Sequence, residues 1–272
     1  MSHCTGACRR GNLTSTAFLS NASVNPANPK PLVYGMPGHT PYDLRKDRKM
    51  SQIKTIRIKQ QILSDNDNLA NEIRNNLKAN DVFMVNIMSS PGAGKTTLLL
   101  ETIRRLGDEM RVGVIEGDIE SMCDAEKITE GGALAVQINT GGSCHLDAPM
   151  VQPAIESIDL DQVDILFLEN IGNLVCPAEF DAGAMRRVML LSIPEGDDKV
   201  MKYPLMFSVC DALLITKTDC MNLFDFDVLT LKKRVVSINP KIKIIMLCSK
   251  TGEGMDEWIN WLRTQRGICL DK

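Results

Sequence analysis

The stretch 82–97, VFMVNIMSSPGAGKTT, decides the fold of this chain. It begins as an apolar run typical of a buried strand, breaks into a glycine-rich loop, and continues into residues with helical spacing. A strand, a glycine loop and a helix in this order predict a P-loop, in which backbone N–H groups and the helix N-terminus bind phosphate oxygens. The strict pattern G-x-x-x-x-G-K-[ST] is not met, because Ser89 stands where its first glycine is expected.

Each residue of this loop is expected to have its own role in nucleotide binding. Lys95 is predicted to reach the β- and γ-phosphates, and the Thr96 hydroxyl is predicted to bind Mg²⁺. A glycine turn before a surface helix is the alternative, but the apolar strand before the loop and the apolar helical face after it favour a nucleotide site. The nucleotide-binding residues expected here are Gly92, Ala93, Gly94, Lys95, Thr96 and Thr97.

Composition limits the class of protein. The chain has 272 residues, 44% of them hydrophobic, which is enough for one large domain or for a domain with a tail. No apolar run is long enough to span a membrane, and the first residues lack the apolar segment of a secretory signal. The net charge of −3 does not favour nucleic acid as a partner. We therefore expect a cytoplasmic protein with neither a membrane nor a nucleic acid among its partners.

The chain is predicted to have three parts. Residues 1–50 are rich in proline and have no apolar period, which predicts a flexible N-terminal arm. Residues 51–80 carry apolar side chains at mostly helical spacing, which predicts an amphipathic lead-in helix that packs on the domain or, less simply, on a partner. Residues 81–272 are predicted to form the P-loop GTPase domain.

Short apolar runs recur after the P-loop, with helical patterns between most of them. This alternation predicts an α/β fold, a mostly parallel sheet with helices on both faces. In such a sheet, ligands bind beyond the carboxyl ends of the strands. The runs are 112–115, 134–138, 163–168, 188–193, 212–215 and 242–247, and the clearest helical patterns are 229–238 and 255–262.

Two of these strand ends carry carboxylates that could serve a magnesium ion. Mg²⁺ prefers oxygen ligands and usually takes one or two carboxylates besides phosphate and water. Glu169 is the stronger Walker-B-like candidate and Asp118 the second, although Asp118 could instead cap a helix. Gly172, in the same loop as Glu169, is expected near the γ-phosphate.

A K-x-D element after the run 212–215 favours GTP over ATP. The Asp219 carboxylate could accept two hydrogen bonds from the guanine edge, which adenine does not offer, while the Lys217 stem covers the ring. Thr216 stands where N-K-x-D proteins have asparagine. A second base-contacting loop is expected at Ser249 and Lys250. Solvated surface charge is the alternative for both loops.

The nine cysteines favour metal binding or core packing over a disulfide framework. Cys144, His145 and Cys176 supply two thiolates and an imidazole, ligands that zinc or nickel accepts. Three ligands leave the metal shell incomplete, so water, a second subunit or a receiving protein could complete it. The alternative is that these are unrelated loop residues. The remaining cysteines of the domain are interpreted as small buried hydrophobes: Cys123, Cys210, Cys220, Cys248 and Cys269.

Several segments together resemble the hydrogenase nickel-incorporation GTPases, the HypB family of the SIMIBI class. They are SSPGAGKTTLL, IEGD, GGSCHLDA, ENIGNLVCPAEFD, EGDDKVMKYP and TGEGMDEWINWL. The resemblance implies GTP hydrolysis and a nucleotide-linked homodimer. The catalytic residues expected for hydrolysis are Lys95, Asp118 and Glu169, with Mg²⁺ held by Thr96, Asp118 and Glu169. It also implies a nickel or zinc site at Cys144, His145 and Cys176. The function it implies is delivery of nickel to the [NiFe]-hydrogenase large subunit precursor, together with a zinc-containing partner chaperone of the HypA type.

The N-terminus departs from this family, many of whose members carry C-x-x-C-x-C there. This chain has His3, Cys4 and Cys8, which could form a nickel site or a vestigial arm. Other readings of the whole chain are a nucleotide-gated scaffold with structural zinc, a related urease-type maturation GTPase, and a P-loop kinase. The sequence leaves open which hydrogenase is served and which of the two metals occupies the domain site.

Overall fold

A computed structural model describes residues 58–107, 109–118 and 123–271, all within one compact unit that runs from Thr55 to Lys272. The predicted arm, with Cys4 and Cys8, lies outside the described residues, as does the predicted start of the lead-in helix at 51–57. The described part of the lead-in segment is the helix α1 (Ile58–Ala79).

The described residues form a seven-stranded sheet in which every strand pair is parallel. Its order, β3-β2-β4-β1-β5-β6-β7, places the P-loop strand β1 at the centre. Each predicted strand is present, and the predicted fold class is confirmed. The bounds are β1 (Phe83–Ser89), β2 (Val112–Asp118), β3 (Leu134–Asn139), β4 (Ile165–Gly172), β5 (Arg186–Ser192), β6 (Ala212–Thr216) and β7 (Lys243–Met246).

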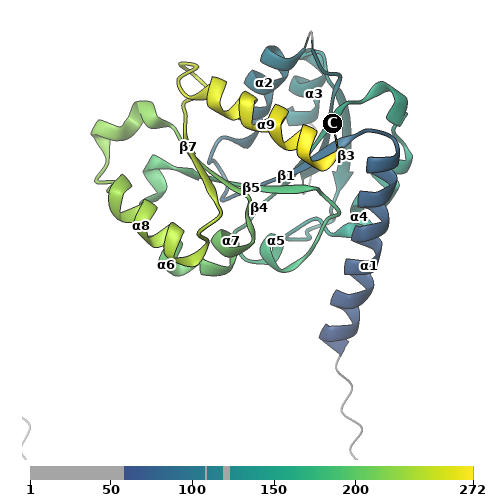
Figure 1. Cartoon of the computed structure of the whole chain (residues 1–272), viewed down its shortest axis with the longest axis horizontal. Coiled ribbons are helices and arrows are strands. Elements are labelled where there is room, and N and C mark those ends of the chain that lie inside the picture. Colours follow the sequence, from purple (N-terminus) through teal and green to yellow (C-terminus); the bar gives the residue numbers. More distant parts are fainter. Residues whose placement is uncertain (1–57, 108, 119–122, 272) are drawn as a thin grey trace, which may run out of the picture. The chain divides into compact units, whose positions relative to one another are not determined.

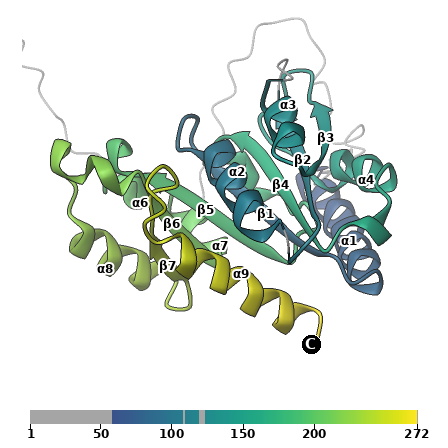
Figure 2. The same ribbon diagram turned by 90° about the horizontal axis from the view of Figure 1, so that it is seen from above.

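Helices cover both faces of the sheet (Figure 1, Figure 2). One face carries α2 (Lys95–Leu106), α3 (Cys123–Glu130) and α9 (Met255–Cys269). On the other face, α1 and α4 (Ala148–Glu156) cover the β2, β4 and β1 side. The β5, β6 and β7 side of that face carries α5 (Cys176–Glu179), α6 (Lys199–Lys202), α7 (Pro204–Val209) and α8 (Val228–Ile238). Short 3-10 helices are η1 (Leu160–Gln162), η2 (Ile193–Glu195) and η3 (Thr218–Leu223).

The central strand is buried on both faces because helices cover both of them. Phe83 and Val85 pack toward α2 and α9, whereas Met84 packs toward α1 and α4. Burying each such side chain stabilises the fold by roughly 1.5–3 kcal/mol. Within the first layer, the indole N–H of the buried Trp258 on α9 donates a 3.0 Å hydrogen bond to the hydroxyl of Thr102 on α2.

Helix α1 packs on the domain through an apolar stripe. Ala70, Ile73 and Leu77 are buried against the second face of the sheet. The amide of Asn66 accepts a 3.1 Å hydrogen bond from the backbone N–H of Ala148 and donates one of 2.9 Å to the carbonyl of Asp181. The helix is therefore bonded to the segments at the far ends of the loops that follow β3 and β4. No helix in the described part of the chain is long and apolar enough to cross a membrane.

Candidate functional site

The P-loop forms the predicted connection between β1 and α2. Gly92 and Gly94 have φ angles of 75° and 102°, a left-handed conformation that glycine adopts without steric cost. Helix α2 begins directly after them, at Lys95. The ammonium of Lys95 donates a 3.2 Å hydrogen bond to the hydroxyl of Ser89. Ser89, which replaces the first glycine of the motif, is therefore in direct contact with the lysine of the same motif.

An oxygen-rich corner lies beside the P-loop. The Thr96 hydroxyl donates a 2.9 Å hydrogen bond to Oε1 of Glu169, whose side chain is 5% exposed. A hydroxyl and a carboxylate in contact form an oxygen pair of the kind that Mg²⁺ takes in phosphate-binding sites. They line a cavity of about 390 Å³, together with Gly92, Gly94, Lys95, Thr97, Lys127 and Lys217.

The second predicted carboxylate is described only in part. Asp118 ends β2, so its backbone is at the expected edge, but its side chain lies outside the described residues. Sequence reasoning missed two neighbours of this corner. Glu116 is buried and pairs in register with Glu169 on the adjacent strand, and Lys127 of α3 lines the cavity. The position of Glu116 two residues before the predicted carboxylate of the same strand was the available signal, because alternate residues share a face.

Gly172 lies directly against the P-loop. A Cβ atom at this position would be 2.9 Å from the backbone nitrogen and the Cα and Cγ atoms of Pro91. Only glycine fits this close approach, so the end of β4 is in direct contact with the P-loop. The contact places Gly172 beside the P-loop, and its expected position near the γ-phosphate stays a prediction.

The P-loop and the loops after β6 and β7 enclose a second cavity, of about 190 Å³. It unites the predicted K-x-D element with the predicted second base loop. Among its lining residues are Ala93, Gly94, Thr97, Thr216, Lys217, Asp219, Ser249 and Lys250.

Two hydrogen bonds join the K-x-D loop to the P-loop. The hydroxyl of Thr216 donates to the carbonyl of Ala93 at 2.8 Å, and the ammonium of Lys217 donates to the carbonyl of Gly92 at 2.7 Å. Lys217 has a φ of 59°, a left-handed conformation uncommon outside glycine, which turns the chain at the end of β6. Thr216, in place of asparagine, therefore connects the K-x-D loop to the P-loop.

Two cysteines of this cavity were predicted to be small buried hydrophobes, and one of them is buried. Cys248 is buried, as expected, but its thiol also donates a 3.3 Å hydrogen bond to Oδ1 of Asp219. Cys220 is half-buried rather than buried, because η3 places it in the cavity wall with its sulfur 3.9 Å from the same oxygen. Of the other predicted core cysteines, Cys210 is buried and Cys269 is half-buried, and the side chain of Cys123 is outside the described residues.

The predicted metal ligands converge. Cys144 and His145 come from the loop after β3, and Cys176 begins α5. The sulfurs of Cys144 and Cys176 are 3.0 Å apart, and the Cys144 sulfur is 3.6 Å from Nδ1 of His145. One ligand atom from each residue lies within 4.8 Å of the other two. The cluster offers two soft sulfurs and one imidazole nitrogen to a metal ion.

The surroundings favour the neutral form of this imidazole. The ring of His145 stacks on Phe180 with centroids 4.2 Å apart, and its Nε2 is buried without a hydrogen-bond partner among the described residues. Burial lowers the pKa of His145, against the opposing effect of the carboxylates of Asp147 and Glu179. The Cys176 thiol and then burial raise the pKa of Cys144. Neutral imidazole is the form that binds a metal, whereas Cys144 must lose a proton to bind.

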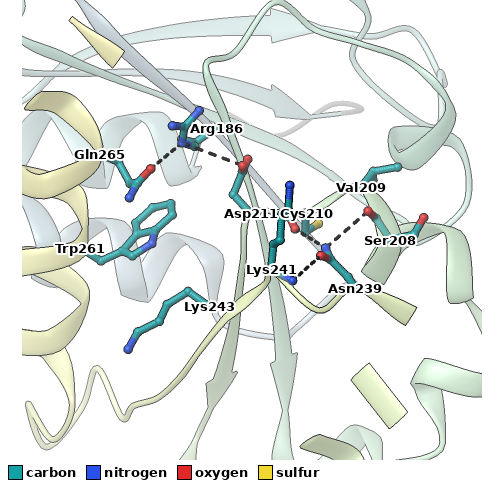
Figure 3. A pocket seen from close by; sticks show the side chains of 10 residues that line it. All are labelled: Arg186, Ser208, Val209, Cys210, Asp211, Asn239, Lys241, Lys243, Trp261 and Gln265. Atoms are coloured by element: carbon teal, nitrogen blue, oxygen red, sulfur yellow. Dashed lines mark hydrogen bonds and ion pairs between the residues drawn. The ribbon is translucent and has the colours of Figure 1, made fainter. Parts of the chain in front are cut away.

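A larger cavity, of about 510 Å³, lies at the opposite edge of the sheet (Figure 3). It lies between α9 and the segments that precede β6 and β7, and it is lined by Arg186, Asp211, Lys243, Trp261 and Gln265 among others. None of the predicted site residues lines it. The chemistry-bearing residues gather instead at the carboxyl edge, where the parallel strands end.

Comparisons with known proteins agree with this geometry. Residues 83–246 match the family model described as CobW/HypB/UreG, nucleotide-binding domain. The hydrogenase maturation factor HypB of Escherichia coli strain K12 is 45% identical over 217 residues, which are 80% of this chain and 75% of the relative.

Two solved structures are similar over most of the described residues. HypB from Archaeoglobus fulgidus has a TM-score of 0.70 and 40% identity, covering 76% of this chain and all of that one. HypB from Helicobacter pylori, solved in complex with nickel, has a TM-score of 0.71 and 38% identity, covering 74% of this chain and 95% of that one. From its P-loop to its strand order and its similarity to these proteins, the chain belongs to the CobW/HypB/UreG nucleotide-binding family and, within it, to the HypB hydrogenase maturation factors.

Proposed function

We propose that this protein is a GTP-hydrolysing nickel metallochaperone that inserts nickel into [NiFe]-hydrogenase. The observation that carries the proposal is the convergence of Cys144, His145 and Cys176 at the same sheet edge as the P-loop. The nickel complex of the similar Helicobacter pylori protein supports the choice of metal. A cytoplasmic location fits delivery to an enzyme precursor.

GTP hydrolysis is assigned to the oxygen-rich corner. Lys95 would neutralise charge on the β- and γ-phosphates, while the N–H groups of the glycine loop hold their oxygens. Thr96, Glu169 and Asp118 are the proposed Mg²⁺ ligands, and bound Mg²⁺ would offset the charge that develops on the phosphates. The motifs contain no evident arginine finger, so we expect slow turnover until a partner or a second subunit contributes one.

Guanine selectivity is assigned to the smaller cavity. Asp219 would accept two hydrogen bonds from the guanine edge, and the Cys248 thiol would hold its carboxylate in place. Ser249 and Lys250 supply the second wall. The contacts from Thr216 and Lys217 to the P-loop fix this cavity relative to the phosphate site.

A homodimer would complete the metal shell. Among the described residues the cluster offers three ligands, and a mononuclear structural zinc site is normally closed by four. Large apolar side chains are exposed directly after the K-x-D element and at the start of α8, with Leu223 and Leu229 more than 70% exposed. Exposed apolar side chains of this size suit a protein–protein contact, here nucleotide-linked dimerisation. The HypA-type chaperone and the hydrogenase large subunit precursor are the proposed partners in metal transfer.

The test is titration of the purified protein with nickel and with zinc, each in the presence and absence of GTP. We expect binding that Cys144→Ala removes and that deletion of residues 1–50 leaves intact. If the deletion removed all nickel binding while Cys144→Ala did not, the metal would belong to the N-terminal arm with Cys4 and Cys8. Zinc held by four protein ligands of one subunit, with no response to nucleotide, would favour the scaffold.

A further inference from the structure

The end of β4 contacts two different loops through its two faces. On one face, Glu169 accepts the hydrogen bond from Thr96 of the P-loop helix. On the other, Asn170 accepts a 3.0 Å hydrogen bond from the backbone N–H of Leu146, the residue after His145. Consecutive strand residues point to opposite faces, so adjacent side chains of one rigid strand contact the nucleotide site and the metal-binding loop.

The Asn170 amide belongs to a buried hydrogen-bond network. Its side chain is 1% exposed, and Oδ1 accepts hydrogen bonds from the backbone N–H groups of Leu146 and Ile171. These two donors require an oxygen at that position, which leaves Nδ2 to donate to Oδ1 of Asn86 at 3.3 Å. Asn86 is buried on β1, the strand that leads into the P-loop. Loss of the amide would leave buried N–H groups without partners, a cost that fixes the arrangement.

A second amide joins the two segments that carry the metal ligands. Nδ2 of Asn173 donates a 3.1 Å hydrogen bond to the carbonyl of Cys144. Its Oδ1 accepts a 2.9 Å hydrogen bond from the backbone N–H of Val175, the residue before Cys176. One side chain therefore holds the backbone of both cysteine-bearing segments in a fixed relation.

We propose that Asn170 and Asn173 are positioning residues through which the nucleotide state sets the metal affinity of the Cys144–His145–Cys176 cluster. The proposal rests on the proposed function and names the route of its regulation. Gly172 lies against Pro91, and Glu169 is bonded to Thr96, so a shift of the P-loop on nucleotide exchange moves this strand end. Asn170 then carries Leu146 with it, and Asn173 carries the backbone of Cys144.

The test measures the nickel dissociation constant with GDP and with a non-hydrolysable GTP analogue, and takes their ratio. For the wild-type chain we expect a ratio that differs from unity by about 5- to 150-fold, the usual range of coupling between sites. In Asn170→Ala the ratio should fall to near unity while all three ligands remain. Asn173→Asp keeps the acceptor for Val175 but loses the donor to Cys144, so it should weaken nickel binding and reduce the ratio.

Asn239→Ala is the matched control. This amide also donates to backbone carbonyls, those of Phe207, Ser208 and Cys210, but it lies at the opposite edge of the sheet (Figure 3). Its ratio should equal that of the wild-type chain even where its melting temperature falls. If Asn170→Ala does not fold, Asn173→Asp alone decides the proposal. The side chain of Asn173 is only half-buried, so its substitution should not prevent folding.

The outcomes separate this proposal from the function on which it rests. A wild-type chain that binds no nickel or does not hydrolyse GTP overturns the proposed function, and the inference with it. A wild-type chain that does both but shows a ratio of unity overturns the inference alone. The same holds if Asn170→Ala and Asn173→Asp fold and keep the wild-type ratio.

Discussion

Thr96 at the start of α2 donates a hydrogen bond of 2.9 Å to Glu169 on β4, across a sequence separation of 73 residues. The bond places a hydroxyl and a buried carboxylate at the mouth of the P-loop, next to Lys95. Thr96 and Glu169 are the residues that would hold Mg²⁺ there, and the bound ion would supply positive charge beside the phosphates. The geometry thus brings the predicted phosphate lysine and two of the predicted magnesium ligands into one corner.

Replacing Lys95 by alanine should abolish GTP turnover. The ammonium is the cation of the P-loop expected to neutralise the β- and γ-phosphates, and loss of one such preorganised group costs about 10²- to 10³-fold in rate. Phosphate release from purified protein measures the effect. Lys243→Ala is the control, because Lys243 pairs with Glu257 at the opposite edge, 2.6 Å away. Hydrolysis at the wild-type rate in pure Lys95→Ala protein would contradict the assignment.

Replacing Asp219 by alanine should reduce the preference for GTP over ATP. Hydrogen bonds to a charged group contribute about 1.5–3 kcal/mol, so selectivity should fall by roughly 10- to 150-fold. Competition between the two nucleotides measures it, with Asp198→Ala as the control, since Asp198 pairs with Lys202 on the surface. If ATP competed as well as GTP for the wild-type chain, Asp219 would not be the base-reading residue.

Hydrophobic patterning predicted the strands but not where they end or how they are ordered. The apolar runs stop at Ile115 and Leu168, whereas β2 and β4 continue to Asp118 and Gly172. Strands are held by hydrogen bonds of the backbone, so they continue past the last apolar side chain. Asp118, for example, still pairs with Asn139 on β3. Strand order depends on which crossovers place β1 between β4 and β5, and no local pattern records that choice.

Helix α4 was missed for a local reason. It contains Pro153 in its interior, a residue that normally ends or bends a helix. The helix is stable here because Asp147 caps its first turn, with its carboxylate accepting a 3.1 Å hydrogen bond from Met150, and because Val151 and Ile155 are buried. Tertiary packing outweighs the local preference.

The candidate site was predictable where one residue type has a distinct chemistry. Cysteine and histidine mark the cluster, and glycine and lysine mark the P-loop. The two asparagines that support the cluster carry no such mark, because an amide bonds equally well in any loop. Asn170 contacts Leu146 across 24 residues, and only the fold brings the two together.

Replacing Asp164 by asparagine should lower the free energy of unfolding near neutral pH by about 1 kcal/mol. The guanidinium and backbone N–H of Arg111 hold the pKa of Asp164 at about 2, below its ordinary 3.8. A depressed carboxylate pKa gives stability that is present above 3.8 and is lost as pH falls toward 2. A quarter of this side chain is exposed, so solvent screening reduces the full effect.

Chemical denaturation of the variant and the wild-type chain between pH 7 and pH 3 measures this difference. The gap between the two free energies should narrow as pH falls below 3.8, the ordinary pKa of this carboxyl group. Asp198→Asn, in a more exposed pair, should lose less stability at pH 7. A gap that stayed constant over the whole range would show that the ion pair with Arg111 is not its source.

Nickel affinity should rise with pH through the thiol range, not through the usual histidine range. Metal binding needs a neutral imidazole and deprotonated thiols. Burial lowers the pKa of His145 below its ordinary 6.5, so this ring loses its proton in more acid solution than an ordinary histidine does. The pKa of Cys144 is raised above its ordinary 9.0 by the Cys176 thiol, so proton loss from Cys144 opposes binding at neutral pH.

Nickel titrations of the wild-type chain between pH 6 and pH 9 test this order of proton release. Affinity should rise by about tenfold per pH unit for each thiol proton that nickel displaces. His145→Ala should lower the affinity but largely keep the slope, because burial shifts proton release from the imidazole toward more acid solution. Cys176→Ala should reduce the slope, because one thiol proton fewer is displaced, whereas Cys269→Ser, outside the cluster, should leave it unchanged. A slope that His145→Ala abolishes would instead place the competing proton on the imidazole and would contradict the effect of burial on that ring.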